Sequence, residues 1–214
     1  MEYAGTAILV MEIMGTIAFA ASGAMVAIHR EMDLFGICVL GVMTAVGGGM
    51  TRDVILCTVP KALTNPLYTA LAALVSIALF VLIYIRRERW LERRHIWYDR
   101  AMFVMDSIGL GAFTAVGVTT GIECGYADKT FLLVFLGTLT GVGGGLLRDI
   151  MAQQEPYILV RHVYACASIV GALSCVILYR CVGEMTALIV SALVVVVIRV
   201  LAAHYHWNLP RLEL

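Results

Sequence analysis

The sequence predicts an all-α integral membrane protein with seven transmembrane helices, and three observations lead to this fold class. First, 61% of the 214 residues are hydrophobic and only 14% are charged, whereas a soluble domain carries about 25% charged residues. Second, the mean hydropathy is +0.92, and the length accommodates about seven spans of about 20 apolar residues with no separate soluble domain. Third, one motif occurs twice, which divides the chain into two three-helix units and a seventh helix.

The apolar stretches, taken in order, define the expected helices. Each is long enough to cross about 30 Å of hydrocarbon. A proline follows the second and the fifth, where its missing N–H ends a helix. The expected ranges are about 4–28, 34–59, 66–85, 100–117, 129–155, 158–179 and 185–203.

The repeated motif reads LGVMTAVGGGMTRDVILCTVP at 40–60 and LGTLTGVGGGLLRDIMAQQEP at 136–156, with 10 of 21 positions identical at an offset of 96. The helix of Glu12 matches that of Asp106 at an offset of 94, and Tyr68 corresponds to Tyr164. Because each unit has an odd number of helices, the two units must enter the membrane from opposite sides, as an inverted repeat. The predicted division is 1–85 for the first unit, 86–99 for a basic linker, 100–180 for the second unit, and 181–214 for the seventh helix and a short tail.

The positions of lysine and arginine predict the orientation. Arg30, the cluster from Arg86 to Arg100, Arg161 and Arg211 would lie on one side, which the positive-inside rule makes cytoplasmic. We therefore expect a multi-pass protein of the inner (plasma) membrane, with its N-terminus outside and its C-terminus in the cytoplasm. The basic linker suits contact with anionic membrane lipids, although topology alone accounts for its charge. The formal net charge is zero, so no nucleic-acid partner is expected.

Each copy of the motif places a glycine triplet in the middle of an apolar helix. Glycine costs a helix about 1 kcal/mol relative to alanine, so the triplets predict that the second and fifth helices are broken. Unwound backbone at membrane depth is tolerated where it lines a water-filled cavity or is buried in protein, so the breaks indicate a permeation path. The alternative is that the glycines allow close helix packing. The triplets are Gly47, Gly48 and Gly49, and Gly143, Gly144 and Gly145.

An arginine and an aspartate follow each triplet, as Arg52-Asp53 and Arg148-Asp149. A lone charge at this depth costs at least about 2.5–3.5 kcal/mol, so these charges must pair, meet water or reach the surface. Pairing within each dipeptide and pairing across the repeats, Arg52 with Asp149 and Arg148 with Asp53, are both compatible with the sequence. The four residues form either a structural salt-bridge cluster or the charged wall of a permeation path.

Glu12 and Asp106 are a second pair of equivalent acids. Each lies on a helical face of small and polar residues, and such a face points into a bundle rather than into lipid. The acids can bind a cation or an ammonium group, or they can hydrogen-bond to backbone near the glycine breaks. Arg199, late in the seventh helix, is expected to reach the cytoplasmic headgroups by snorkelling.

No enzyme signature is present. The sequence contains no Walker motif, no HExxH pair and no GxSxG elbow, the patterns that would indicate nucleotide, zinc or serine chemistry. His204 and His206 stand two residues apart, so they do not converge on one metal from a helix, and the six cysteines form no CxxC pair. We therefore expect no catalytic activity, no cofactor and no metal site.

Two copies of GGGxxRD, each followed by a proline in a seven-helix inverted repeat, resemble the bacterial members of the trimeric intracellular cation channel (TRIC) superfamily, also called the glycine transporter domain family. The stretch from Arg199 to Pro210 is similar to that family's ending. The resemblance implies a homotrimer with a separate pore for K⁺ or Na⁺ in each protomer, lined by the second and fifth helices. It also implies that the glycine triplets form the kinks of these helices and that both Arg-Asp pairs lie beside the path.

Two further functions remain open at this point. The same residues suit a carrier of glycine, because the glycine carboxylate can meet backbone amides and its ammonium group can meet Glu12 or Asp106. A membrane scaffold without transport is the third possibility, but the chain has no soluble interaction segment longer than the basic linker.

Overall fold

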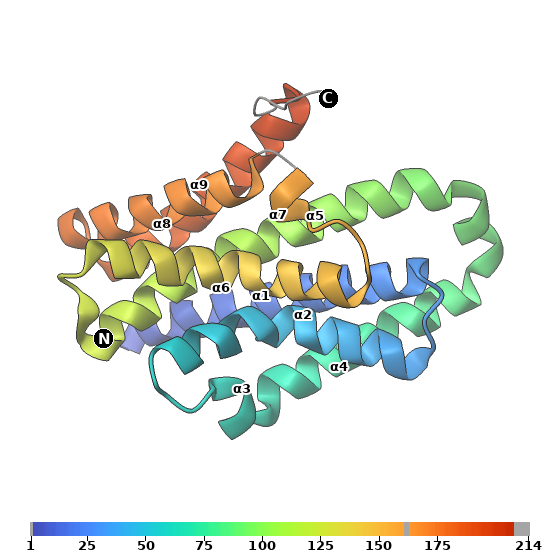
Figure 1. Ribbon diagram of the computed structural model, residues 1–214, viewed down its shortest axis with the longest axis horizontal. Coiled ribbons are helices and arrows are strands. Elements are labelled where there is room, and N and C mark those ends of the chain that lie inside the picture. The colour runs from blue at the N-terminus through green and yellow to red at the C-terminus, as the bar shows by residue number, and fades with distance from the viewer. Residues whose placement is uncertain (1, 161–162, 208–214) are drawn as a thin grey trace.

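The computed structural model describes residues 2–160 and 163–207, and every regular element in these ranges is a helix (Figure 1). Seven helices are long and apolar enough to cross a membrane, which confirms the predicted fold class. They are α1 (Glu2–His29), α2 (Leu34–Ile55), α4 (Pro66–Ile85), α5 (Arg87–Gly121), α6 (Thr130–Met151), α8 (Tyr164–Cys181) and α9 (Glu184–His204). The short elements between them are α3 (Lys61–Thr64), the π-helical η1 (Ile122–Tyr126) and α7 (Tyr157–Val160).

The sequence repeat is also a repeat of structure. An offset of 96 residues relates both bounds of α2 to those of α6, and both bounds of α3 to those of α7. The two long helices end four residues before the predicted bounds of 59 and 155. They end there because Cys57 and Gln153 adopt left-handed backbone, with φ of 55° and 51°. The next amide donates back to the carbonyl of Asp53 or Asp149, at 2.9 and 3.0 Å, which closes each helix end before the proline.

The glycine triplets do not break their helices. α2 runs without interruption through 47–49, and α6 runs without interruption through 143–145. The prediction of broken helices is therefore corrected. The helical backbone keeps its own hydrogen bonds, and the missing side chains allow α2 and α6 to approach each other closely, which is the alternative that the sequence left open.

Two other boundaries differ from expectation. α5 begins at Arg87, so the segment expected as a linker is helical; residues 86–99 contain five arginines and two glutamates, which favour helix. The side chains of 87–97, and with them the expected contact of this segment with lipid, lie outside the described residues. α8 begins at Tyr164 rather than at 158, because α7 takes up 157–160.

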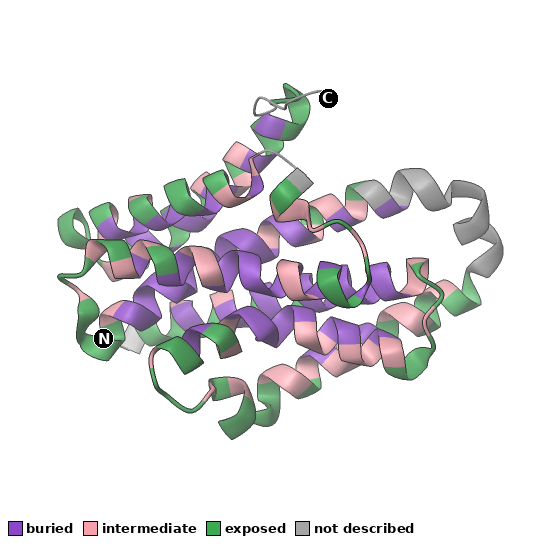
Figure 2. Ribbon diagram, viewed as in Figure 1, coloured by how far each residue is buried: buried purple, intermediate pink, exposed green. Residues whose placement is uncertain are grey.

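Burial is concentrated in the middle of the molecule, where α1, α2, α5 and α6 pack against one another (Figure 2). α4, in contrast, buries only Ala72 and Ser76, and its outer face is apolar, as a lipid-facing helix requires. The centre buries charge, and among the described residues each charged residue there is at most 9% exposed. These residues are Glu12, Arg52, Asp53, Asp106, Arg148, Asp149 and Arg199.

Candidate permeation site

α2 and α6 cross at the glycine triplets with almost no space between their backbones. A Cβ atom on Gly48 would collide with the carbonyl oxygen of Thr140, and a Cβ atom on Gly144 would collide with that of Thr44. The same offset of 96 relates both members of these two contacts, so the crossing lies on the pseudo-twofold axis of the repeat. The ring of Phe19 covers it from α1, 3.1 Å from the position of a Cβ on Gly144.

The second-repeat cluster consists of Asp106, Arg148, Asp149 and Arg199. The Arg148 Nη1 lies 2.8 Å from Asp106 Oδ1, and its Nε lies 2.8 Å from Asp149 Oδ1. Arg148 Nη1 also donates to the hydroxyl of Ser22 on α1. Removing charges from water is costly, and the cost is offset in part where the geometry is good and further hydrogen bonds are made. Nε and Nη1 of Arg148 make such bonds, whereas its buried Nη2 has no hydrogen-bond partner among the described residues.

Arg199 joins the second-repeat cluster from α9. Its Nη2 lies 3.5 Å from Asp106 Oδ2, and its Nε donates to Ser107 Oγ at 3.3 Å. The guanidinium also stacks on the rings of Tyr164 and Phe103, 4.8 and 4.9 Å from their centroids. Arg199 is only 5% exposed, so the expectation that it reaches the headgroups is wrong. The buried carboxylate of Asp106 offers it an ionic partner inside the bundle.

The first-repeat cluster consists of Glu12, Arg52, Asp53 and Lys61. Arg52 Nη2 lies 2.7 Å from Asp53 Oδ1, and its Nε lies 2.8 Å from the same oxygen. The hydroxyl of Tyr68 donates to Glu12 Oε2. Lys61 Nζ lies 3.7 Å from Glu12 Oε1. Each cluster thus contains two acids and two bases.

Each arginine pairs within its own dipeptide, which decides between the two pairings that the sequence left open. The second oxygen of each aspartate accepts the backbone N–H of the first residue of the following short helix. These distances are 2.9 Å from Lys61 N to Asp53 Oδ2 and 2.8 Å from Tyr157 N to Asp149 Oδ2. The aspartates therefore hold α3 and α7 against the ends of α2 and α6.

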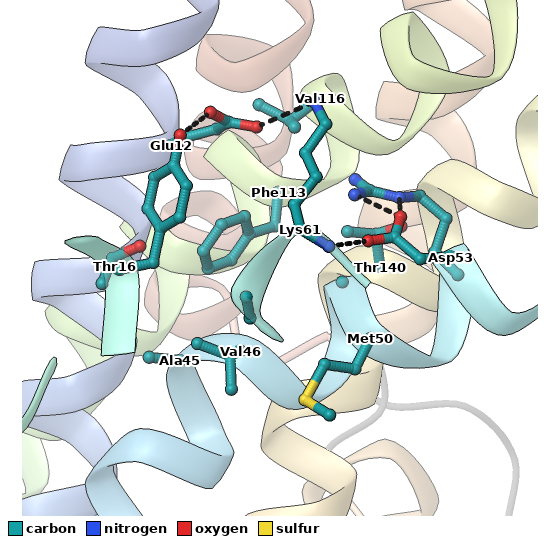
Figure 3. Close-up of a pocket in the computed structure, with 14 residues that line it drawn as sticks. Glu12, Thr16, Ala45, Val46, Met50, Asp53, Lys61, Phe113, Val116 and Thr140 are labelled. Atoms are coloured by element: carbon teal, nitrogen blue, oxygen red, sulfur yellow. Dashed lines mark hydrogen bonds and ion pairs between the residues drawn. The ribbon is translucent and has the colours of Figure 1, made fainter. Parts of the chain in front are cut away.

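A cavity with charged, polar and apolar side chains in its wall lies beside the first-repeat cluster (Figure 3). It offers about 50 Å³ to the centres of water-sized molecules, whereas one water needs about 10–15 Å³ on this measure. Figure 3 shows Lys61 extended from Asp53, to which its backbone is bonded, across to the carboxylate of Glu12. The polar and charged residues that line the cavity are Glu12, Thr16, Arg52, Asp53, Lys61, Tyr68 and Thr140.

The structure places the predicted site residues at the cavity wall, at the helix crossing or in the two charged clusters. Gly49 lines the cavity, whereas Gly48 and Gly144 serve the helix crossing. Glu12 and Asp106 lie in the clusters of their own repeats but have different ionic partners, Lys61 for Glu12 and two arginines for Asp106. Within the described part of the chain, no group of three histidine, cysteine, aspartate or glutamate side chains is placed to hold a metal ion.

Sequence reasoning missed several residues of the two clusters. Ser22 and Arg199 reach the second-repeat cluster from helices far away in the chain. Tyr68 and Tyr164 were visible as repeat equivalents, and the structure gives both the same task, a hydrogen bond to the acid of their own repeat. Lys61 carried one usable signal, its position directly after the proline that closes the first motif.

Known proteins resemble this chain in sequence and in architecture. A family model described as Glycine transporter matches residues 9–84 and 103–180. The UPF0126 inner membrane protein YadS from Escherichia coli strain K12 is 34% identical over 206 residues, which is 95% of either chain. A solved structure described as "Structural basis for conductance through TRIC cation channels" is 34% identical, with a TM-score of 0.80 over 96% of this chain and 97% of that chain.

The chain is a bacterial member of the TRIC family. This confirms the resemblance that the paired GGGxxRD motif indicated. A second TRIC structure, of a prokaryotic channel in 0.5 M KCl, is 26% identical, with a TM-score of 0.84 over 94% of this chain and 98% of that chain. The chain is thus a multi-pass membrane protein that shares the TRIC fold over nearly its whole length.

Proposed function

We propose that this protein is a channel for the monovalent cations K⁺ and Na⁺, with a separate pore in each protomer. The observation that carries the proposal is the cavity beside the first-repeat cluster. It lies among membrane-spanning helices and brings the carboxylate of Glu12 together with the oxygen atoms of Thr16 and Tyr68. Oxygen atoms of this kind can replace part of the hydration shell of an ion. The related structure described in terms of conductance through TRIC cation channels supports a cation as the permeant species.

In this proposal the first repeat supplies the charged residues that line the path. Glu12, Arg52, Asp53 and Gly49 line the path, and Lys61 stands at its edge. The remaining predicted residues do not line the path. They stabilise the surrounding helices, through packing at the triplets and through the ion pairs of the second-repeat cluster. These supporting residues are Gly47, Gly48, Gly143, Gly144, Gly145, Asp106, Arg148 and Asp149.

A carrier of glycine is the second candidate. The description of the matching family model favours it, and so does the presence of both Glu12 and Arg52 on the cavity wall. A glycine zwitterion bound there would have its ammonium group at the carboxylate and its carboxylate at the guanidinium. The likeness to channel structures rather than to enzymes gives catalysis no support.

The proposal extends to assembly and topology. Each homotrimer would contain three chains of 23.3 kDa, and light scattering of the detergent-solubilised protein measures this mass. The protein would lie in the inner membrane with its N-terminus outside, in contact with membrane lipids. The division into two three-helix units, a basic segment at 86–99 and a seventh helix belongs to the same proposal.

The test uses the purified full chain in liposomes, with K⁺ flux and uptake of labelled glycine measured on one preparation. K⁺ flux without glycine uptake supports the channel, whereas saturable glycine uptake with trans-stimulation and little K⁺ flux overturns it in favour of the carrier. Neither activity in a folded preparation overturns both.

A matched pair of variants on α3 connects the flux to the cavity. Ala62 lines the cavity, whereas its neighbour Leu63 is 68% exposed. We expect Ala62→Phe to reduce K⁺ flux strongly because its ring enters the path, and Leu63→Phe to leave the flux unchanged. Equal flux in the two variants would show that the ions pass elsewhere.

A further inference from the structure

The two repeats neutralise their equivalent acids in different ways. Asp106 is 0% exposed, and the guanidinium groups of Arg148 and Arg199 lie 2.8 and 3.5 Å from its two oxygens. Both arginines are packed among other side chains, so this acid has fixed counter-ions. Glu12 has Lys61 as its ionic partner instead. The side chain of Lys61 is 48% exposed, so its ammonium group can leave for water without passing through the protein.

The contact between Lys61 and Glu12 is loose. Nζ lies 3.7 Å from Oε1, beyond the 2.7–3.2 Å or so of a direct N–H···O hydrogen bond. Tyr68 occupies the other oxygen of Glu12, so Oε1 is the oxygen that an arriving ion would meet. A lysine ammonium is a compact charge on a flexible four-carbon stem, which makes it a mobile occupant of this position.

The second repeat shows that the backbone hydrogen bond made at position 61 does not require a lysine side chain. Tyr157 stands at the equivalent position and donates its N–H to Asp149 Oδ2 at 2.8 Å, as Lys61 donates to Asp53 Oδ2 at 2.9 Å. Tyr157 has no charge, and its ring faces Arg148, with the guanidinium carbon 5.6 Å from the centroid. The hydrogen bond that begins the short helix is therefore independent of the side chain, and the ammonium group of Lys61 needs a different explanation.

We propose that Lys61 is a tethered cation that competes with the permeant monovalent cation for Glu12, and so sets the concentration at which the cavity fills. This rests on the proposed channel function, and it names the regulation of that same site. With Lys61 in place, the four charged groups at the cavity wall, Glu12, Arg52, Asp53 and Lys61, sum to zero. When Lys61 swings into water, the cavity carries one net negative charge, which a K⁺ ion neutralises at Glu12 Oε1.

The experiment compares wild type with Lys61→Met, which keeps the length of the stem and removes the charge. We expect the flux of Lys61→Met at low KCl, relative to its flux at high KCl, to rise about fivefold, since exposed ion pairs contribute at most about that factor. Lys61→Arg keeps a tethered charge and should behave as wild type. Tyr157→Met, the same substitution at the equivalent position, should leave the ratio unchanged. If Lys61→Met folds poorly, Lys61→Gln takes its place.

A second readout does not depend on permeation. We measure the melting temperature of the full chain in detergent against KCl, with choline chloride keeping the ionic strength constant. The KCl concentration of half-maximal stabilisation should fall about fivefold in Lys61→Met. In a chain that carries Glu12→Gln, adding Lys61→Met should leave this concentration unchanged. An unchanged or higher concentration in Lys61→Met overturns the competition. If wild type carries no K⁺ flux, the channel proposal fails, and the melting data still decide the role of Lys61.

Discussion

Two acids at equivalent places in the repeats have different partners, and this difference predicts different costs of removal. Asp106→Asn would leave the buried Arg148 and Arg199 with too little negative charge, and breaking a buried pair in this way costs about 3–5 kcal/mol. Glu12→Gln would lose the ion pair with the partly exposed Lys61 while keeping an amide oxygen that can accept from the Tyr68 hydroxyl, and such exposed pairs contribute about 0–1 kcal/mol. Denaturant unfolding of both variants in detergent measures the difference. Equal losses of stability would mean that the two clusters are equally rigid.

Neighbouring glycines of one triplet should respond differently to replacement by alanine. The Cβ of Gly48→Ala would collide with the Thr140 carbonyl of α6, whereas the Cβ of Gly49→Ala would meet only Arg52 Nη2, at 3.9 Å. Overpacking costs about 1–3 kcal/mol, and alanine returns about 1 kcal/mol of helix propensity. The melting temperature should therefore fall in Gly48→Ala and stay equal or rise in Gly49→Ala. A rise in both would show that the triplet does not serve the crossing.

At the scale of elements, the short helices α3 and α7 begin on the carboxylates that end the GGGxxRD motifs. Asp53→Ala would remove the acceptor of the Lys61 amide, and hydrogen bonds to charged groups contribute about 1.5–3 kcal/mol. Amide exchange across 61–64 should therefore accelerate about tenfold or more. The control is Asn65→Ala, which removes the cap that accepts from the Leu67 amide at 3.0 Å. It should affect the start of α4 and leave the Lys61 amide protected.

The seventh helix is tied to the repeats by charge as well as by packing. Arg199 carries α9 into contact with Asp106 and Ser107 of α5. The small residue Gly111 of α5 lets the helices approach, since a Cβ there would lie 2.7 Å from the Ala192 carbonyl oxygen. α9 has no counterpart in the first repeat, so the tertiary asymmetry between the two acids arises in part from this unrepeated element.

At the scale of the whole molecule, the predicted orientation can be tested with cysteine labelling. Cys57 is exposed in the turn after α2, on the side predicted to lie outside. In a chain with Cys57 as its sole cysteine, a membrane-impermeant maleimide should label intact cells. Arg30→Cys in a cysteine-free chain tests the exposed turn after α1 and should be labelled only after permeabilisation. The reverse pattern would invert the topology.

The sequence by itself determined the number of spans, the approximate bounds of most helices, the repeat and the family. These are local properties, because apolar length, proline positions and a motif at constant offset are readable without knowing which helices touch. It also identified six of the seven buried charged side chains, since a charge inside an apolar stretch is visible in the chain itself.

The tertiary structure decided what those residues do. The triplets close a helix crossing because Thr44 and Thr140 lie opposite them on the partner helix, and propensity alone favoured a break. The arginines pair with their neighbours, Arg199 turns inward to Asp106, and Lys61 reaches Glu12. The arginine pairs join neighbours in the chain, but the helix crossing, the inward position of Arg199 and the contact of Lys61 with Glu12 depend on distances between residues far apart in the chain. Packing and electrostatic pairing act through those distances rather than through sequence order.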